Sequence, residues 1–253
     1  MSLVKKSYFL SRKDYKFRPY LDVGLSGNKQ LAIPKKSNGA SYVIKGGNRE
    51  CACNEFVGLR LAKMLGVCVP NAYLVEPKQY TYEVAIEYLA PMPKPDLDRV
   101  RNEESLLRAY VYGVIAHCLF EDRDVMDFLF ADNKLYTFDF ADGFRTDDII
   151  ISVMENASKL TATVPAEFVA KFITPDVDYH PNTLFAYEML VDEQQVCDKA
   201  YFDAALDDIC ARFLSIPDEE INGMLNALGT QYPAALVAHF KHYIDEIRKF
   251  CQQ

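Results

Sequence analysis

The chain has 253 residues, half of them hydrophobic and a quarter charged, which is the composition of a globular protein rather than a disordered one. Its net charge of −8 argues against direct nucleic-acid binding, which relies on clustered Lys and Arg. Because it has no apolar run of about 18 residues and no signal-peptide core, we expect no membrane span and a cytoplasmic protein whose seven cysteines are reduced.

Three short strands and two turns are predicted at the start of the chain. Segments 21–25 and 30–34 form two strands joined by a turn at Ser26-Gly27-Asn28-Lys29, where Gly and Asn tolerate positive φ. A second turn leads to a third strand that ends in Lys45. This succession predicts an antiparallel meander. The first 20 residues, which are basic and aromatic, indicate no chemistry.

A helix and two more strands are predicted to follow. From Glu50 the apolar residues recur at helical spacing, with Glu55 in the first turns. The helix is expected to end at Gly66, because glycine tolerates the left-handed conformation that closes many helices. Strands are predicted over residues 67–75 and 82–89.

A proline-rich segment marks the candidate boundary between two lobes. Pro91, Pro93 and Pro95 fall within five residues and interrupt regular structure after the last of these strands. We therefore predict an α+β, bilobal fold, with a small β-rich N-terminal lobe over residues 1–91 and a larger helical C-terminal lobe over residues 92–253.

The C-terminal lobe is predicted to be mostly helical. Residues 103–120 are apolar along most of their length and are expected to form a buried central helix. From residue 165 to the end, the pattern predicts four or five amphipathic helices. His239 and His242 lie three residues apart without cysteines at zinc-knuckle spacing, so we expect packing or surface residues rather than a zinc site.

An acidic loop and a hairpin follow the central helix. Asp122 and Asp127 lie five residues apart just after it, and a short hairpin then leads to Asp139. This arrangement can bring carboxylates to one point, as phosphoryl transfer requires, since one acid orients a hydroxyl and others supply oxygen ligands to a divalent metal. Asp124 is an alternative to Asp122, because both flank Arg123.

The order of these elements resembles a protein-kinase-like bilobal domain. Strands with a Gly turn, a strand Lys, a helix Glu and a hinge strand are followed by an acidic loop and an Asp-bearing hairpin. In such a domain the backbone N–H groups of the Gly turn cover phosphates, the Lys adds a positive charge there, and the Glu holds the Lys in place.

Within that class the sequence resembles the HipA-like kinase family over about residues 20–145. The motifs that carry the resemblance are Leu25-Ser26-Gly27-Asn28-Lys29, Tyr42-Val43-Ile44-Lys45, Asn54-Glu55, Leu65-Gly66-Val67-Cys68-Val69-Pro70, and Asp122 with Asp127 and Asp139. The Ile-Lys strand, the Asn-Glu helix and the Leu-Gly-Val-x-Val-Pro exit are the most specific of these, because they occur together at distances similar to those of the family.

The resemblance implies a nucleotide site in the N-terminal lobe. Lys45 would contact the α- and β-phosphates of ATP, and Glu55 would hold Lys45 in place. The residues that would cover the phosphates are Ser26, Gly27, Asn28 and Lys29. The residues that would form the hinge at the adenine are Glu87, Tyr88 and Leu89.

The resemblance places the chemistry in the C-terminal lobe. Asp122 would be the catalytic base, and Asp127 and Asp139 would be the Mg²⁺ ligands. Two positions depart from the family pattern, because Asp127 stands where the family usually has Asn, and Asp139-Phe140-Ala141 lacks the Gly of the usual kinase triplet. The extra carboxylate adds negative charge near the γ-phosphate, which would slow turnover or favour another metal.

These residues imply an ATP- and Mg²⁺-dependent kinase that phosphorylates a Ser or Thr hydroxyl of a protein. The departures leave a second class open, a pseudokinase that binds nucleotide, or only a partner, and acts as a scaffold. A small-molecule or lipid kinase is a third alternative, since the acidic loop does not reveal the acceptor. The resemblance also allows a partner chain that acts as an antitoxin or supplies the N-terminal domain of larger family members.

Overall fold

The computed structural model describes residues 8–19, 30–37, 39–46, 49–76, 83–122, 128–144, 182–232 and 234–253. Several predicted features lie outside these stretches: the strand over residues 21–25, the turn from Ser26 to Lys29, and the acids Asp124 and Asp127. Their assigned structure and roles stay predictions.

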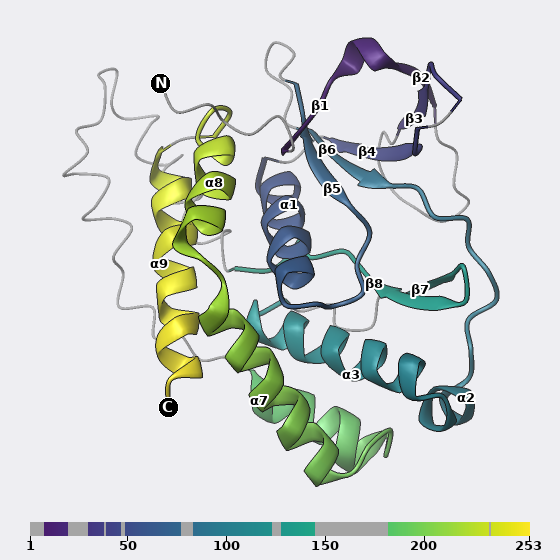
Figure 1. Ribbon diagram of the computed structural model, residues 1–253, viewed down its shortest axis with the longest axis vertical. Coiled ribbons are helices and arrows are strands. Elements are labelled where there is room, and N and C mark those ends of the chain that lie inside the picture. Colours follow the sequence, from purple (N-terminus) through teal and green to yellow (C-terminus); the bar gives the residue numbers. More distant parts are fainter. Residues whose placement is uncertain are drawn as a thin grey trace.

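The N-terminal part is built on a six-stranded sheet in the order β1-β5-β6-β4-β3-β2 (Figure 1). The strands are β1 (Phe9–Leu10), β2 (Tyr15–Pro19), β3 (Gln30–Pro34), β4 (Tyr42–Gly46), β5 (Ala72–Val75) and β6 (Glu83–Glu87). β1 pairs in parallel with β5, and the other pairs are antiparallel. Strands β3 to β6 confirm predicted ones, whereas β1 and β2 come from the first 20 residues, where none was predicted.

Two details of the sheet differ from the prediction. The antiparallel meander runs through β2, β3 and β4, so the strand that precedes β3 in the meander is β2, from residues 15–19. β5 starts at Ala72 and not at residue 67, and Pro70, which has no backbone N–H to give to a ladder, lies just before it. The shorter strand leaves residues 67–71 as a connection between helix and sheet.

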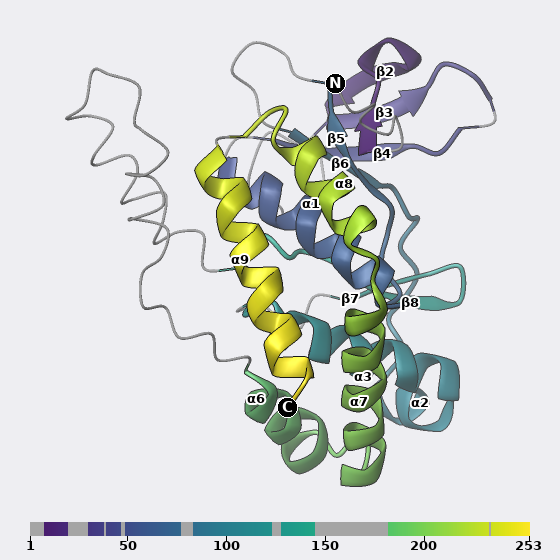
Figure 2. The same cartoon turned by 60° about the vertical axis from the view of Figure 1, so that its left-hand side comes forward.

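Helix α1 (Arg49–Met64) connects β4 to β5 and packs on the sheet. It ends as predicted, because Gly66 adopts a left-handed φ of 78° and its N–H bonds to the carbonyl of Lys63. The helix is buried along most of its length, since the sheet covers one side and α8 (Asp218–Leu228) lies along another (Figure 2).

The segment after β6 has no regular secondary structure as far as Asp96, as predicted for the proline-rich segment. Asp96 caps a short helix, α2 (Leu97–Asn102), by accepting a hydrogen bond from the N–H of Arg99 at 2.8 Å. This helix was not predicted. The predicted central helix is confirmed as α3 (Glu104–Leu119), whose second half is almost completely buried. It is the element on which the hairpin rests.

The hairpin consists of β7 (Phe128–Ala131) and β8 (Lys134–Thr137) and confirms the prediction. Its turn residues, Asp132 and Asn133, both have positive φ, as a two-residue type I′ turn requires. The hairpin approaches α3 closely at Gly113, where a Cβ atom would lie 2.8 Å from the ring of Phe128. Close packing here fixes where the chain leaves β8.

Helices make up the described C-terminal region, residues 182–253. They are α6 (Thr183–Tyr187) with a π-helical turn (Glu188–Glu193), α7 (Lys199–Ser215), α8, and α9 (Ala234–Cys251). These helices confirm the predicted helical tail over the described residues. In both views α8 and α9 lie beside α1, so the last part of the chain covers the helix that supports the sheet (Figure 1, Figure 2).

One large hydrophobic core joins α1, α3, the hairpin and the C-terminal helices, and a smaller one lies on the sheet around Ala32, Ile44 and Ala85. Within the described stretches no helix is both long and apolar enough to cross a membrane. Among the cysteines whose side chains the structure describes, none forms a disulfide: Cys53, Cys68, Cys118, Cys197, Cys210 and Cys251.

Candidate functional site

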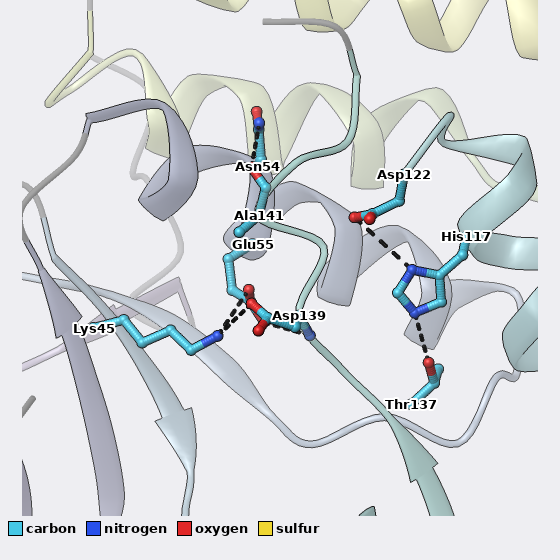
Figure 3. Close-up of polar contacts among 8 residues, drawn as sticks. All are labelled: Lys45, Asn54, Glu55, His117, Asp122, Thr137, Asp139 and Ala141. Carbon is cyan, nitrogen blue, oxygen red and sulfur yellow. Dashed lines mark hydrogen bonds and ion pairs between the residues drawn. The ribbon is translucent and has the colours of Figure 1, made fainter. Parts of the chain in front are cut away.

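Three charged side chains from different elements meet beside the sheet (Figure 3). Lys45 on β4 places its Nζ 3.2 Å from Glu55 Oε2 on α1 and 2.7 Å from Asp139 Oδ1, just after β8. The backbone N–H of Asp139 donates to Glu55 Oε1 at 3.1 Å. The structure thus brings together three of the predicted site residues, which we call the Lys45–Glu55–Asp139 cluster.

Local backbone geometry explains how the cluster forms. Lys45 follows the buried Ile44 on β4, and side chains alternate across a strand, so Lys45 leaves the side that Ile44 occupies. Asp139 has a φ of 69°, a left-handed conformation that Asp tolerates better than most residues. This turn lets its N–H and its carboxylate both reach toward the Lys45–Glu55 pair.

Burial differs within the cluster and sets its electrostatics. The Glu55 side chain has no exposed surface, whereas Lys45 keeps 21% and Asp139 31% of theirs. Burial raises the pKa of Glu55 to about 7, because desolvation outweighs the attraction of Lys45 and Asp139 adds repulsion. Desolvation lowers the pKa of Lys45, but the carboxylates of Glu55 and Asp139 outweigh it, and the net pKa is raised.

The raised pKa of Glu55 predicts a pH-dependent stability. The folded protein holds the Glu55 proton more tightly than the unfolded chain, whose ordinary pKa is about 4.3. This contribution is fully present below about pH 4 and is lost as the pH rises through about 7. The free energy of unfolding of wild type minus that of Glu55→Gln should therefore fall by about 1 kcal/mol per pH unit between pH 5 and pH 7.

Urea unfolding of both proteins across this pH range measures the difference. Glu55→Gln is the reference for wild type, because its amide does not titrate. A difference that stays flat with pH, or that rises, would show that Glu55 is already ionised at pH 5.

Asn54, next to Glu55, adds a second link from α1 to the segment after β8. Its side chain is completely buried, and its Nδ2 donates to the carbonyl of Ala141 at 2.8 Å. Consecutive residues of α1 therefore hold Asp139 and Ala141. The sequence motif contained Asn54, but sequence patterns alone gave it no role.

Phe140 is held between two helices. A Cβ atom on Gly58 of α1 would lie 2.5 Å from the Cβ of Phe140, so only glycine allows this approach. On α3, the ring of His117 stacks on Phe140 with centroids 4.1 Å apart and planes 12° apart. A glycine inside a helix is a signal of close packing, so Gly58 was open to detection from sequence, whereas nothing marked His117.

Asp122 lies in a buried polar group and not in the Lys45–Glu55–Asp139 cluster. Its carboxylate points toward His117, with Oδ2 3.8 Å from Nδ1, and His117 Nε2 lies 2.7 Å from Thr137 Oγ1 (Figure 3). Thr, His and Asp are the groups of a hydrolase triad, but these three side chains are buried and closed to a substrate. Here they tie α3, Asp122 and the end of β8 together.

The predicted hinge residues lie at the end of β6, which Glu87 closes, and just after it. The N–H of Glu87 donates to Asn71 O and the N–H of Tyr88 donates to Ser41 O, both at 2.8 Å. Among the described residues, none accepts a hydrogen bond from the backbone N–H of Leu89. The role of Glu87, Tyr88 and Leu89 as a hinge stays a prediction.

Metal binding depends on how many oxygen ligands the site can supply. Within the described residues no three His, Cys, Asp or Glu side chains gather at metal-binding distance. Mg²⁺ commonly takes one or two carboxylates and completes its shell with phosphates and water. The partly exposed carboxylate of Asp139 fits one such ligand, and Asp127, outside the described stretches, stays a predicted second.

The fold is mixed α+β and kinase-like, with an N-terminal sheet and a helical C-terminal region. In it, a Lys on a strand pairs with a buried Glu on a helix, and both contact an Asp that follows a hairpin. No protein-family model matches the chain, and no curated protein matches its sequence. Among solved structures, the proinflammatory kinase CtkA of Helicobacter pylori is similar with a TM-score of 0.53 and 17% identity, over 94% of this chain and 96% of that one.

A second similar structure is HipA of a toxin–antitoxin system of Shewanella oneidensis MR-1, solved with HipB and operator DNA. It has a TM-score of 0.44 and 12% identity, over 93% of this chain and 65% of that one. At such identities the likeness concerns the fold. The similarity to CtkA extends over nearly the whole of both chains and confirms the predicted kinase-like fold.

Proposed function

We propose that this protein is an ATP- and Mg²⁺-dependent kinase that transfers a phosphoryl group to a Ser or Thr hydroxyl of a protein. The observation that carries the proposal is the Lys45–Glu55–Asp139 cluster, in which an ammonium is fixed by a buried carboxylate and faces a partly exposed one. The fold shared with CtkA supports it. The proposal includes a division into two lobes, with the boundary near residue 91.

Each residue of the cluster has a defined task in this proposal. Lys45 binds the α- and β-phosphates with its ammonium, and Glu55 holds Lys45 at the end of β4. The backbone of Glu87 to Leu89 binds the adenine edge, and the turn from Ser26 to Lys29 covers the phosphates. Asp139 and Asp127 would hold Mg²⁺, which when bound neutralises charge on the phosphates.

Asp122 is proposed as the base that accepts the proton of the attacking hydroxyl, leaving the oxygen to bond to phosphorus while the bond to the ADP oxygen breaks. Its carboxylate is buried beside His117, so it must become accessible when the acceptor binds. Asp124 is the alternative base.

A pseudokinase is the second candidate function, favoured by Asp127 in place of the family's Asn and by the burial of Asp122. Such a protein would bind nucleotide through the same cluster without transferring phosphate. A small-molecule or lipid acceptor, and a partner chain that acts as an antitoxin or supplies an N-terminal domain, also stay predictions.

Nucleotide binding is the direct test, and Lys45→Ala is the informative variant. Wild type should be stabilised by about 3 kcal/mol at a hundred-fold excess of MgATP over its Kd. Lys45→Ala should raise the Kd about tenfold or more, because a charge-assisted contact to the phosphates is lost. Thermal shift and calorimetry with MgATP measure both effects, and radiolabelled ATP then tests transfer.

A matched control is Lys199→Ala, which removes a lysine paired with Asp203 at 2.5 Å on the exposed face of α7. It should bind MgATP as wild type does. Binding without transfer over a range of acceptors would favour the nucleotide-binding pseudokinase. The absence of any binding by wild type would contradict the kinase and leave only a scaffold that binds a partner.

A further inference from the structure

Two loops that carry proposed catalytic acids are joined to each other. The first loop, residues 120–122, contains Asp122, and the second loop, residues 139–144, begins with Asp139. The N–H of Phe144 donates to the carbonyl of Phe120 at 2.7 Å, and their rings stack with centroids 5.2 Å apart. A shift of one loop is therefore passed to the other.

Both loops contain non-glycine residues in left-handed backbone conformations. The φ angles are 51° at Glu121, 69° at Asp139 and 63° at Phe144. Such conformations are unfavourable for residues with a Cβ, most of all for a bulky one such as Phe, and persist only where surrounding contacts maintain them. Asn54 and Glu55 hold the start of the second loop, so the other positions need support from elsewhere.

That support comes from the C-terminal helix. Tyr243 on α9 donates its hydroxyl to Glu121 Oε2 at 2.5 Å, and His239, one turn earlier, donates from Nε2 to the carbonyl of Phe144 at 2.7 Å. The ring of Phe144 also meets those of Phe240 and Tyr243 edge to face. Burial lowers the pKa of His239 to about 4, so it is neutral at physiological pH and its contact needs no charge.

We propose that α9 is part of the active site, with Tyr243 positioning the loop that carries Asp122 and His239 positioning the loop that begins at Asp139. Neither residue touches the Lys45–Glu55–Asp139 cluster in any described contact, so Tyr243 acts through the Glu121 side chain, next to Asp122, and His239 acts through the backbone carbonyl of Phe144, at the end of the loop that begins with Asp139. The inference rests on the proposed function for its effect on catalysis, whereas the positioning of the loops can be measured without any activity.

The hydroxyl of Tyr243 separates positioning from simple packing. Tyr243→Phe keeps the ring that packs on Phe144 and removes the hydroxyl that donates to Glu121. We expect kcat for phosphoryl transfer to fall about tenfold, the effect of losing a hydrogen bond to a charged group, while KM for ATP changes less than about twofold. Glu121→Gln should lower kcat in the same direction, and the double variant should lose little more than either single one.

Tyr112→Phe is the matched control. Its hydroxyl donates to Asp208 at 2.6 Å between α3 and α7, so the variant loses a similar hydrogen bond away from the two loops. It should keep the kcat of wild type. If Tyr112→Phe and Tyr243→Phe lowered kcat equally, loss of general stability would explain both, and the positioning role would be wrong.

Hydrogen exchange gives a readout that is independent of catalysis. The amides of Asp122 and Phe144 donate to His117 O and Phe120 O, so they report on both loops. In the ligand-free protein, Tyr243→Phe and His239→Ala should speed exchange of peptides covering the two loops about tenfold, and Tyr112→Phe should not. If the two variants exchange faster while wild type shows no kinase activity, the inference stands and the kinase is rejected. Unchanged exchange in the variants would reject the inference whatever the activity.

Discussion

Asp139→Ala is expected to abolish phosphoryl transfer and to lower kcat by about a thousandfold or more. The site loses a proposed Mg²⁺ ligand, so the negative charge of the phosphates is no longer neutralised as well. The same variant frees Lys45 from its 2.7 Å partner, so Lys45 keeps only Glu55. MgATP should still bind, with a weaker dependence on Mg²⁺. Single-turnover rates and calorimetry across Mg²⁺ concentrations measure the two effects separately.

Backbone strain must be separated from chemistry in this experiment, because Ala at a φ of 69° is unfavourable. Asp139→Asn tolerates this φ and removes only the charge, so it should also lose most of the rate. Asp132→Asn changes another Asp at positive φ, in the hairpin turn, and should stay active. An active Asp139→Asn protein with wild-type Mg²⁺ dependence would remove Asp139 from the metal site.

Asp122→Asn is expected to lower kcat by about 10²–10⁴-fold, the usual contribution of a general base, with ATP affinity unchanged within about twofold. The isosteric amide keeps the packing beside His117, so folding should be preserved. Rapid-quench measurements of transfer, together with binding of MgATP, separate the chemical step from nucleotide affinity.

Asp124→Asn is the comparison that decides between the two candidate bases. If it lost the larger share of kcat and Asp122→Asn lost little, the base would be Asp124, and the buried group of Asp122, His117 and Thr137 would be structural. Loss in neither variant would favour the pseudokinase.

Local sequence signals were sufficient for the elements that carry the Lys45–Glu55–Asp139 cluster. The end of α1 at Gly66, the apolar α3 and the turn at Asp132-Asn133 each have a nearby physical cause, and all three are confirmed. The pairing of Lys45 with Glu55 was predicted from the family resemblance, in which a strand Lys is followed by a helix Glu. The structure contains this ion pair.

Long-range features were not predictable in this way. β1 has two residues and pairs in parallel with β5, some 65 residues later, and two residues carry no periodic signal. The same holds for Asp122, whose neighbour His117 is fixed by tertiary packing, and for Tyr243 and His239, which look like ordinary members of an amphipathic helix. Such contacts depend on the assembled fold and leave no pattern in one sequence.

The position of α9 in the chain has a consequence for synthesis. Its contacts with the two loops span 122 residues from Glu121 to Tyr243 and 95 from Phe144 to His239. A chain emerging from the ribosome gains its N-terminal segments first. Lys45, Glu55 and Asp139 can meet long before α9 exists, whereas the backbone around Asp122 and Phe144 gains these anchors only after residue 243 has been made.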